Sequence, residues 1–181
     1  MKLEYILEEQ DFLTHQLYAA SKSENIEKKR KRTRLRVPMI YAVVGIFACF
    51  MQNYGLGGVF LVLAVLWYVF YPLWEKGHYL KHYRNYIKEN YSERVGKAIS
   101  FEWIGDHLFV KDAVSEGKIL ISEIEEIDEI GVAFYIKIRS GVYFILPKDK
   151  VGEVSAVRAE LQKLAEEVQV PYKREEEWVW K

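Results

Sequence analysis

The side chains best suited to chemistry are two histidines four residues apart, with a glutamate one turn before them. In a helix, His78 and His82 share one face, and Glu75 lies near that face. Imidazole and carboxylate groups bind zinc, so these residues are a candidate metal site. The glutamate of an HExxH motif is missing, however, and an amphipathic surface would explain both histidines. We therefore expect no metal and no cofactor, and keep a metal-dependent membrane enzyme as an alternative.

A second chemical candidate is the acidic segment 123–130, EIEEIDEI. It lacks the alternating Asp or Asn and the central glycine of a calcium loop, so a solvated acidic face is expected instead. The chain also lacks the Walker, GxGxxG, GxSxG and CxxC motifs. Its single cysteine, Cys49, lies in an apolar run where a thiol is usually inert. These patterns predict no catalytic residues and a protein that is not an enzyme.

Charge is unevenly distributed, although the formal net charge is zero. Residues 22–36 hold eight Lys or Arg and two Glu, whereas residues 97–181 hold twelve Lys or Arg and seventeen Asp or Glu. A basic run of this kind can bind nucleic acid, but an uncharged block of 38 residues, 37–74, follows it directly. We interpret the run as a membrane boundary that contacts anionic headgroups, and expect no nucleic-acid partner.

The uncharged block is too long for one membrane-spanning helix. A helix of this length would extend about 57 Å, nearly twice the roughly 30 Å of a hydrocarbon core. Its middle, QNYGLGG at 52–58, predicts a turn between spans at 35–51 and 59–74. Pro38 is expected near the start of the first span and Pro72 near the end of the second. A buried hairpin in a soluble protein is the alternative, but it should show polar residues at helical period.

Aromatic and basic residues mark the expected ends of these spans. Four aromatic residues near the end of the second span predict a belt at the membrane interface: Trp67, Tyr68, Tyr71 and Trp74. The cations flanking the hairpin are Lys28, Lys29, Arg30, Lys31, Arg32, Arg34, Arg36, Lys76, Lys81, Arg84 and Lys88. Because the connecting loop has no charge, the positive-inside rule predicts a cytoplasmic N-terminus and C-terminus. The block 37–74 contains no Asp, Glu, Lys or Arg, which favours an anchor over a small transporter or channel subunit.

Helices are expected on both sides of the hairpin, at 9–34 and 75–94, the first with a partial apolar stripe. Alternating residues then predict an α+β domain at 97–170. Its strands are expected at 98–104, 107–113, 118–122, 133–139 and 142–147, with a final amphipathic helix at 149–168. The segment 123–130 is interpreted as a strand with a bulge, with a short helix as the alternative. Residues 1–8 are expected to form a strand that can join this sheet.

Five strands, or six with the N-terminal one, and one C-terminal helix predict a small antiparallel barrel or sandwich of the pleckstrin-homology-like (PH-like) type. The tail, 171–181, contains Trp178 and Trp180. Exposing tryptophan is unfavourable, so we expect the tail to fold back on the barrel, with lipid or partner binding as alternatives.

Several stretches resemble the YcxB-like family of bacterial membrane proteins. They are LEYILEEQDFLTHQLYAASKS at 3–23, the basic run leading into a two-span hairpin, and YFILPKD at 143–149 before the last helix. The resemblance covers nearly the whole chain in the same order. It implies a bacterial two-span membrane protein with a C-terminal PH-like domain, and it supplies no catalytic residues.

The leading hypothesis is therefore a non-enzymatic interaction or regulatory protein of the bacterial cytoplasmic membrane. Its PH-like domain would bind a protein partner, a second copy of the chain or a lipid headgroup. The absence of a catalytic motif and the uncharged hairpin are the two sequence features behind it.

Overall fold

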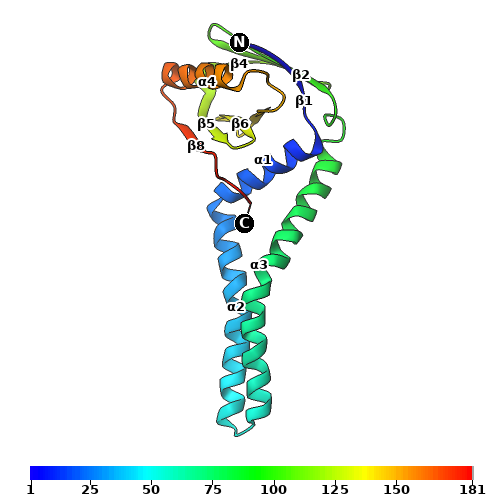
Figure 1. Cartoon of the computed structure of the whole chain (residues 1–181), viewed down its shortest axis with the longest axis vertical. Helices are drawn as coiled ribbons and strands as arrows, with labels where there is room; N and C mark the ends of the chain where they lie inside the picture. The colour runs from blue at the N-terminus through cyan, green and yellow to red at the C-terminus, as the bar shows by residue number, and fades with distance from the viewer. Residues whose placement is uncertain (181) are drawn as a thin grey trace. The chain divides into compact units, whose positions relative to one another are not determined.

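The computed structural model describes residues 1–180, which form two compact units of different architecture (Figure 1). The helical unit contains Leu17–Tyr83 together with Trp180. The sheet unit contains Met1–Gln16 and Arg84–Val179. The expected combination of a helical part and an α+β sheet domain is confirmed at this level.

The helices are longer and divided differently than predicted. They are α1 (Glu9–Lys22), α2 (Glu24–Phe50) and α3 (Tyr54–Asn90). The prediction of one helix over 9–34 is wrong, because Ser23 caps α2 by accepting a hydrogen bond from the backbone N–H of Ile26. Pro38 and Pro72 lie inside α2 and α3 rather than at span ends, so each expected span is continuous with the helix that flanks it.

Glycines bring α2 and α3 together instead of forming the turn that was expected at 52–58. The chain reverses over residues 51–53, and Asn53 accepts the N–H of Leu56 in the first turn of α3. A Cβ added to Gly57 would lie 2.3 Å from Cys49 Sγ, and one added to Gly45 would lie 3.0 Å from the Gly57 carbonyl oxygen. These small residues let the two helices run side by side (Figure 1).

The sheet unit contains two four-stranded sheets. The first has the order β1-β2-β3-β4 and is antiparallel throughout: β1 (Lys2–Ile6), β2 (Ala98–Ile104), β3 (His107–Lys111) and β4 (Glu116–Leu120). The N-terminal strand thus joins the sheet formed after the hairpin. The second has the order β7-β6-β5-β8: β5 (Ile124–Ile130), β6 (Ala133–Ile138), β7 (Tyr143–Pro147) and β8 (Tyr172–Glu175).

Two features of the second sheet differ from a simple antiparallel sandwich. Strand β8 lies within the segment that was expected to be only a tail, and it pairs parallel with β5. Strand β5 follows a short 3-10 helix, η1 (Ile121–Glu123), and its register with β6 shifts between Ile124 and Glu126. The irregular segment 123–130 is therefore a strand with a local irregularity. Helix α4 (Val154–Val168) begins five residues later than expected.

The core of the sheet unit lies between its sheets and under α4. Phe101 of β2 and Phe144 of β7 have ring centroids 5.9 Å apart, which places the two sheets in contact. Leu161 and Leu164 of α4 are fully buried. The alternating inward residues of both sheets exclude water from this layer, which is the main driving force for the unit's folding.

Candidate functional site

A cavity of about 230 Å³ lies inside the sheet unit. The two sheets contribute one wall each, and α1 with the segment after α3 contributes the rest. Its lining is mainly apolar and aromatic: Tyr5, Leu7, Phe12, His15, Tyr91, Arg94, Ile99, Val110, Asp112, Ser115, Gly117, Ile119, Tyr143, Phe144 and Ile145. Ser115 and Gly117 are exposed, so the cavity opens to solvent beside β4.

The buried polar group in this wall is His15. Its ring lies 4.6 Å from the ring of Tyr143 and 5.1 Å from that of Tyr135, and the residue is only 8% exposed. Burial lowers the pKa of His15 to about 4, so the imidazole is neutral at pH 7. Its Nε2 atom is buried and has no hydrogen-bond partner among residues 1–180. Such groups are rare in folded proteins, because desolvation without a partner is unfavourable.

An ion pair closes the polar side of the cavity. Arg94 Nε lies 3.3 Å from Asp112 Oδ2. Asp112 Oδ1 also accepts the N–H groups of Val114 and Ser115 at 2.8 and 2.6 Å. Burial alone would raise the pKa of Asp112, but these N–H groups and Arg94 outweigh it and lower the pKa. The carboxylate is therefore ionised and neutralises the cation at the edge of the cavity.

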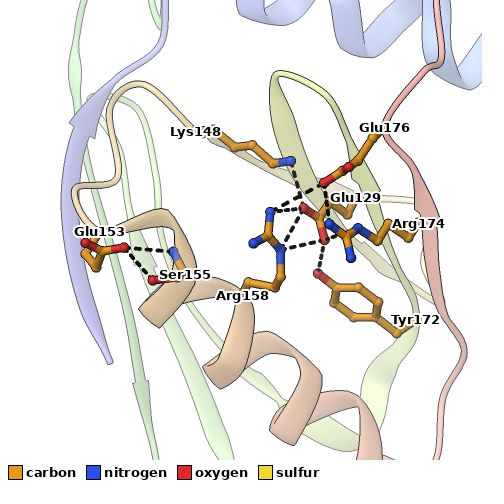
Figure 2. A network of polar contacts seen from close by, with 8 residues as sticks. All are labelled: Glu129, Lys148, Glu153, Ser155, Arg158, Tyr172, Arg174 and Glu176. Carbon is orange, nitrogen blue, oxygen red and sulfur yellow. Dashed lines mark hydrogen bonds and ion pairs between the residues drawn. The ribbon is translucent and has the colours of Figure 1, made fainter.

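A second buried titratable group, Glu129 of β5, lies in a dense polar network (Figure 2). Arg158 of α4 donates from Nε and Nη2 to Glu129 Oε1 at 2.9 and 2.7 Å. Lys148 donates at 2.7 Å, and the Tyr172 hydroxyl of β8 donates to Oε2 at 2.7 Å. Arg174 Nε lies 3.9 Å away. The network joins β5, β8, α4 and the segment after β7.

The partners of Glu129 hold it ionised. Burial would raise the pKa of its carboxyl, but the hydrogen bonds from Arg158, Lys148 and Tyr172 lower the pKa to about 2. Both carboxylate oxygens accept hydrogen bonds from these three partners. A carboxylate in this state accepts no proton near neutral pH, so we assign it a structural role.

The expected solvated acidic face at 123–129 is therefore only partly correct. Glu129 is fully buried and Asp128 is 3% exposed, whereas Glu125 is exposed on its outer face. Glu126 is partly buried, with partners in Lys137 and Lys173. The error arose because the cations closest to Glu129 are Lys148, after β7, and Arg158 of α4, and both are distant from it in the sequence.

The candidate metal residues of α3 take separate partners. Glu75 is buried and pairs with Arg30 of α2 at 3.1 Å, and Tyr71 donates its hydroxyl to the same carboxylate at 3.4 Å. His78 stacks on Trp74, with centroids 5.2 Å apart, while His82 lies beside Tyr83. Within residues 1–180, no group of three or more His, Cys, Asp or Glu side chains could hold a metal ion.

The aromatic and basic residues of the hairpin contact one another. Trp67 stacks on Tyr71 with centroids 5.4 Å apart, and Arg34 lies over the ring of Tyr68 at 4.5 Å. Trp74 is 62% exposed. Two of the flanking cations, Arg30 and Arg34, are half-buried, and the exposed ones are Lys28, Lys29, Lys31, Arg32, Arg36, Lys76, Lys81, Arg84 and Lys88.

The tail is divided between the two units: β8 joins the second sheet, and Trp180 belongs to the helical unit. Trp180 is 8% exposed, and its ring lies 4.7 Å from the Arg30 guanidinium and 5.6 Å from the ring of Tyr79. It therefore extends the cluster around Arg30 and Glu75 through cation–π and aromatic contacts. The expectation that it would dock on the barrel is wrong for Trp180.

Sequence reasoning missed the cavity and His15. The one available signal was the position of His15 three residues after Phe12, within an apolar stripe. Comparisons of the chain with protein-family models, curated proteins and solved structures found no match. The functional argument therefore depends on the geometry alone.

Proposed function

We propose that this chain is a membrane-anchored, non-enzymatic binding protein of the YcxB-like type. In this proposal α2 and α3 cross a bacterial cytoplasmic membrane as a hairpin. The sheet unit is a PH-like module on the cytoplasmic side, where it binds a ligand or partner.

The observation that carries the proposal is the exposed apolar surface of α2 and α3. The most apolar stretches of the two helices are only 11% and 17% buried. Large side chains on them are open, including Phe50 at 81%, Leu73 at 70% and Val43 at 67% exposure. A soluble protein rarely exposes so large a continuous apolar surface, whereas lipid would cover it. The small residues turn inward, since Gly45, Ala48, Gly57 and Ala64 are all buried.

The distribution of charge supports cytoplasmic termini. Both helices carry their Lys and Arg at the ends away from the connecting turn, and that turn, 51–53, has no charge. Exposed lysines at this boundary can contact anionic headgroups, whereas Arg30 is neutralised by buried Glu75. Nothing in this arrangement supports a nucleic-acid partner.

The sheet unit supports binding rather than catalysis. Its best-defined buried charge, Glu129, is fully occupied by structural partners. Its cavity, in contrast, has space and an unpartnered polar atom. A protein partner or a second copy of the chain remains part of the proposal, since exposed Val132, Val142 and Val179 offer contact sites.

A topology experiment tests the anchor. The full chain, expressed in a bacterium with a reporter at either terminus, should remain in the membrane after alkaline carbonate extraction, with both reporters cytoplasmic. Replacing Lys28–Arg36 cations with Gln should scramble this orientation, because the positive-inside signal would be lost. As a matched control, replacing Lys111, Lys118 and Lys163 with Gln should leave orientation unchanged. Release of the chain by carbonate, or an unchanged orientation in the first variant, would refute the proposal.

A further inference from the structure

The cavity between the sheets opens to solvent and has room for a small molecule. Protein interiors pack as densely as organic crystals, and voids larger than a water molecule are few. This one measures about 230 Å³, and its walls come from strands β1 to β4, β7 and α1. Keeping such a space open loses the contacts that its lining side chains would otherwise make, which a ligand would restore.

The size of the cavity limits its occupant. A cavity of about 150 Å³ accommodates benzene, so a cavity with about one and a half times that volume fits roughly nine to eleven non-hydrogen atoms. That range includes a bicyclic ring or a substituted phenol. Larger groups such as nucleotides, full lipids and peptides would extend out of the cavity into solvent.

The lining selects an aromatic and uncharged occupant. Phe12 and Tyr91 pack against each other at 4.9 Å, and Phe144 and Tyr143 line the opposite wall. Flat rings pack well in such surroundings through offset and edge contacts. The charges at the edge, Arg94 and Asp112, neutralise each other, so an anion would have to break their ion pair before it could use Arg94.

His15 adds a requirement for one polar group. Its imidazole is neutral and its Nε2 atom has no partner, so a ligand hydroxyl or N–H group that reached it would replace the water lost on folding.

We propose that the cavity binds a small neutral aromatic molecule that carries one hydroxyl or N–H group, of phenol to naphthol size. The ligand would lie between the sheets with its ring among Phe12, Tyr91, Tyr143 and Phe144, and its polar group at His15. This proposal rests on the proposed function, since it gives the anchored module a ligand class.

Strand β4 offers a variant that closes the cavity without disturbing the fold. Gly117 pairs with Val110, and both lie on the cavity face together with Ile119. A Cβ at Gly117 would meet no atom within 4 Å, so Gly117→Val fits and also improves strand propensity. Lys118→Val places the same side chain on the opposite face of the same strand and is the matched control.

Binding is measured with the full chain in nanodiscs, by isothermal titration calorimetry and saturation-transfer NMR. The probes are indole, 2-naphthol, naphthalene and octanoate. We expect saturable binding of indole and 2-naphthol, one molecule per chain, weakened at least tenfold in Gly117→Val and changed less than twofold in Lys118→Val. His15→Phe should abolish a preference of about five- to tenfold for 2-naphthol over naphthalene.

Three results would overturn the proposal. They are the absence of saturable binding to the folded wild-type chain, equal binding by Gly117→Val, which would indicate partition into lipid, and tighter binding of octanoate than of 2-naphthol. Retention of the His15→Phe preference would overturn the role of His15. Carbonate extraction of membranes from cells that express the same variants reports separately on the anchor, so a failure of ligand binding is distinguishable from a failure of the proposed function.

Discussion

His15 and Glu129 are both buried titratable groups of the sheet unit, but their surroundings are opposite. Glu129 receives hydrogen bonds from Arg158, Lys148 and Tyr172, while His15 Nε2 has no partner within residues 1–180 and lies in a cavity wall. Burial is unfavourable for both, yet only Glu129 is compensated inside the protein. The difference indicates that Glu129 holds the fold together, whereas His15 is available to a ligand.

The largest expected loss of stability comes from replacing Glu129, whose burial is compensated by its hydrogen-bond partners. Glu129→Leu would leave partly buried Lys148 without its carboxylate partner and Arg158 with only Glu176, 3.5 Å away, so the free energy of unfolding should fall by about 3–5 kcal/mol. Near-ultraviolet circular dichroism during denaturant unfolding in detergent measures it. Glu125→Gln, at an exposed ion pair with Lys137, is the control and should cost less than about 1 kcal/mol. Equal losses in the two variants would contradict the structural role of Glu129.

Acid should affect the two groups in different pH ranges. The pKa of His15 is lowered from 6.5 to about 4 on folding and that of Glu129 from 4.5 to about 2. In both cases the unfolded state binds more protons, so stability falls on acidification, first between about pH 6.5 and 4 and then between about 4.5 and 2. Each group contributes about 3 kcal/mol to the full change in the free energy of unfolding.

Melting temperatures at pH 7, 5 and 4 measure the first range. His15→Phe should flatten the pH dependence between 6.5 and 4 and leave the lower range intact. A variant that loses stability as steeply as the wild type over that range would show that His15 is not the titrating group.

A tyrosine-to-phenylalanine replacement tests one hydrogen bond of the Glu129 network. Tyr172→Phe removes a hydroxyl that donates to the buried Glu129 carboxylate, so the free energy of unfolding should fall by about 2 kcal/mol. Chemical denaturation measures the change. Tyr54→Phe, at an exposed position of α3, should be neutral by the same measurement.

The smallest expected effect is a gain in stability rather than a loss. His15→Phe removes a polar group that has no partner and keeps a ring of similar shape, so stability at pH 7 should rise by up to about 1 kcal/mol. The same denaturation assay compares it with Tyr172→Phe. A loss as large as that of Tyr172→Phe would mean that His15 makes a stabilising contact, and it would weaken the case for a ligand.

The sequence was informative where the signal is local. Hydrophobic alternation located strands such as Ala98–Ile104 almost to the residue, and the uncharged block predicted the two apolar helices. The glycines at 55–58 were wrongly predicted to form a turn, because glycine is common both in turns and where two helices pack closely. Only the distance between Gly57 and Cys49 distinguishes the two uses.

The site could not be predicted because its parts come from distant segments. The two apolar helices separate His15 from Asp112 and Tyr143 in the sequence, so the three residues come together only in the folded chain. Likewise, no residue near Glu129 in the sequence indicates that Arg158 will bind it or that β8 will pair in parallel with β5. Alternation assigns faces to residues but does not say which faces meet, nor whether they leave a space between them.

The pairing of β1 with β2 sets an order of events during synthesis. Ile6 leaves the ribosome about ninety residues before its partner Ala98, with both apolar helices made in between. At about 5–20 residues per second, the first strand waits roughly 5–20 s for its neighbour. Tyr5 and Leu7, both buried in the finished protein, are exposed for that time. Both apolar helices are therefore synthesised before the sheet can be completed, and a pause between these steps would prolong the period in which the nascent N-terminus can associate with other chains.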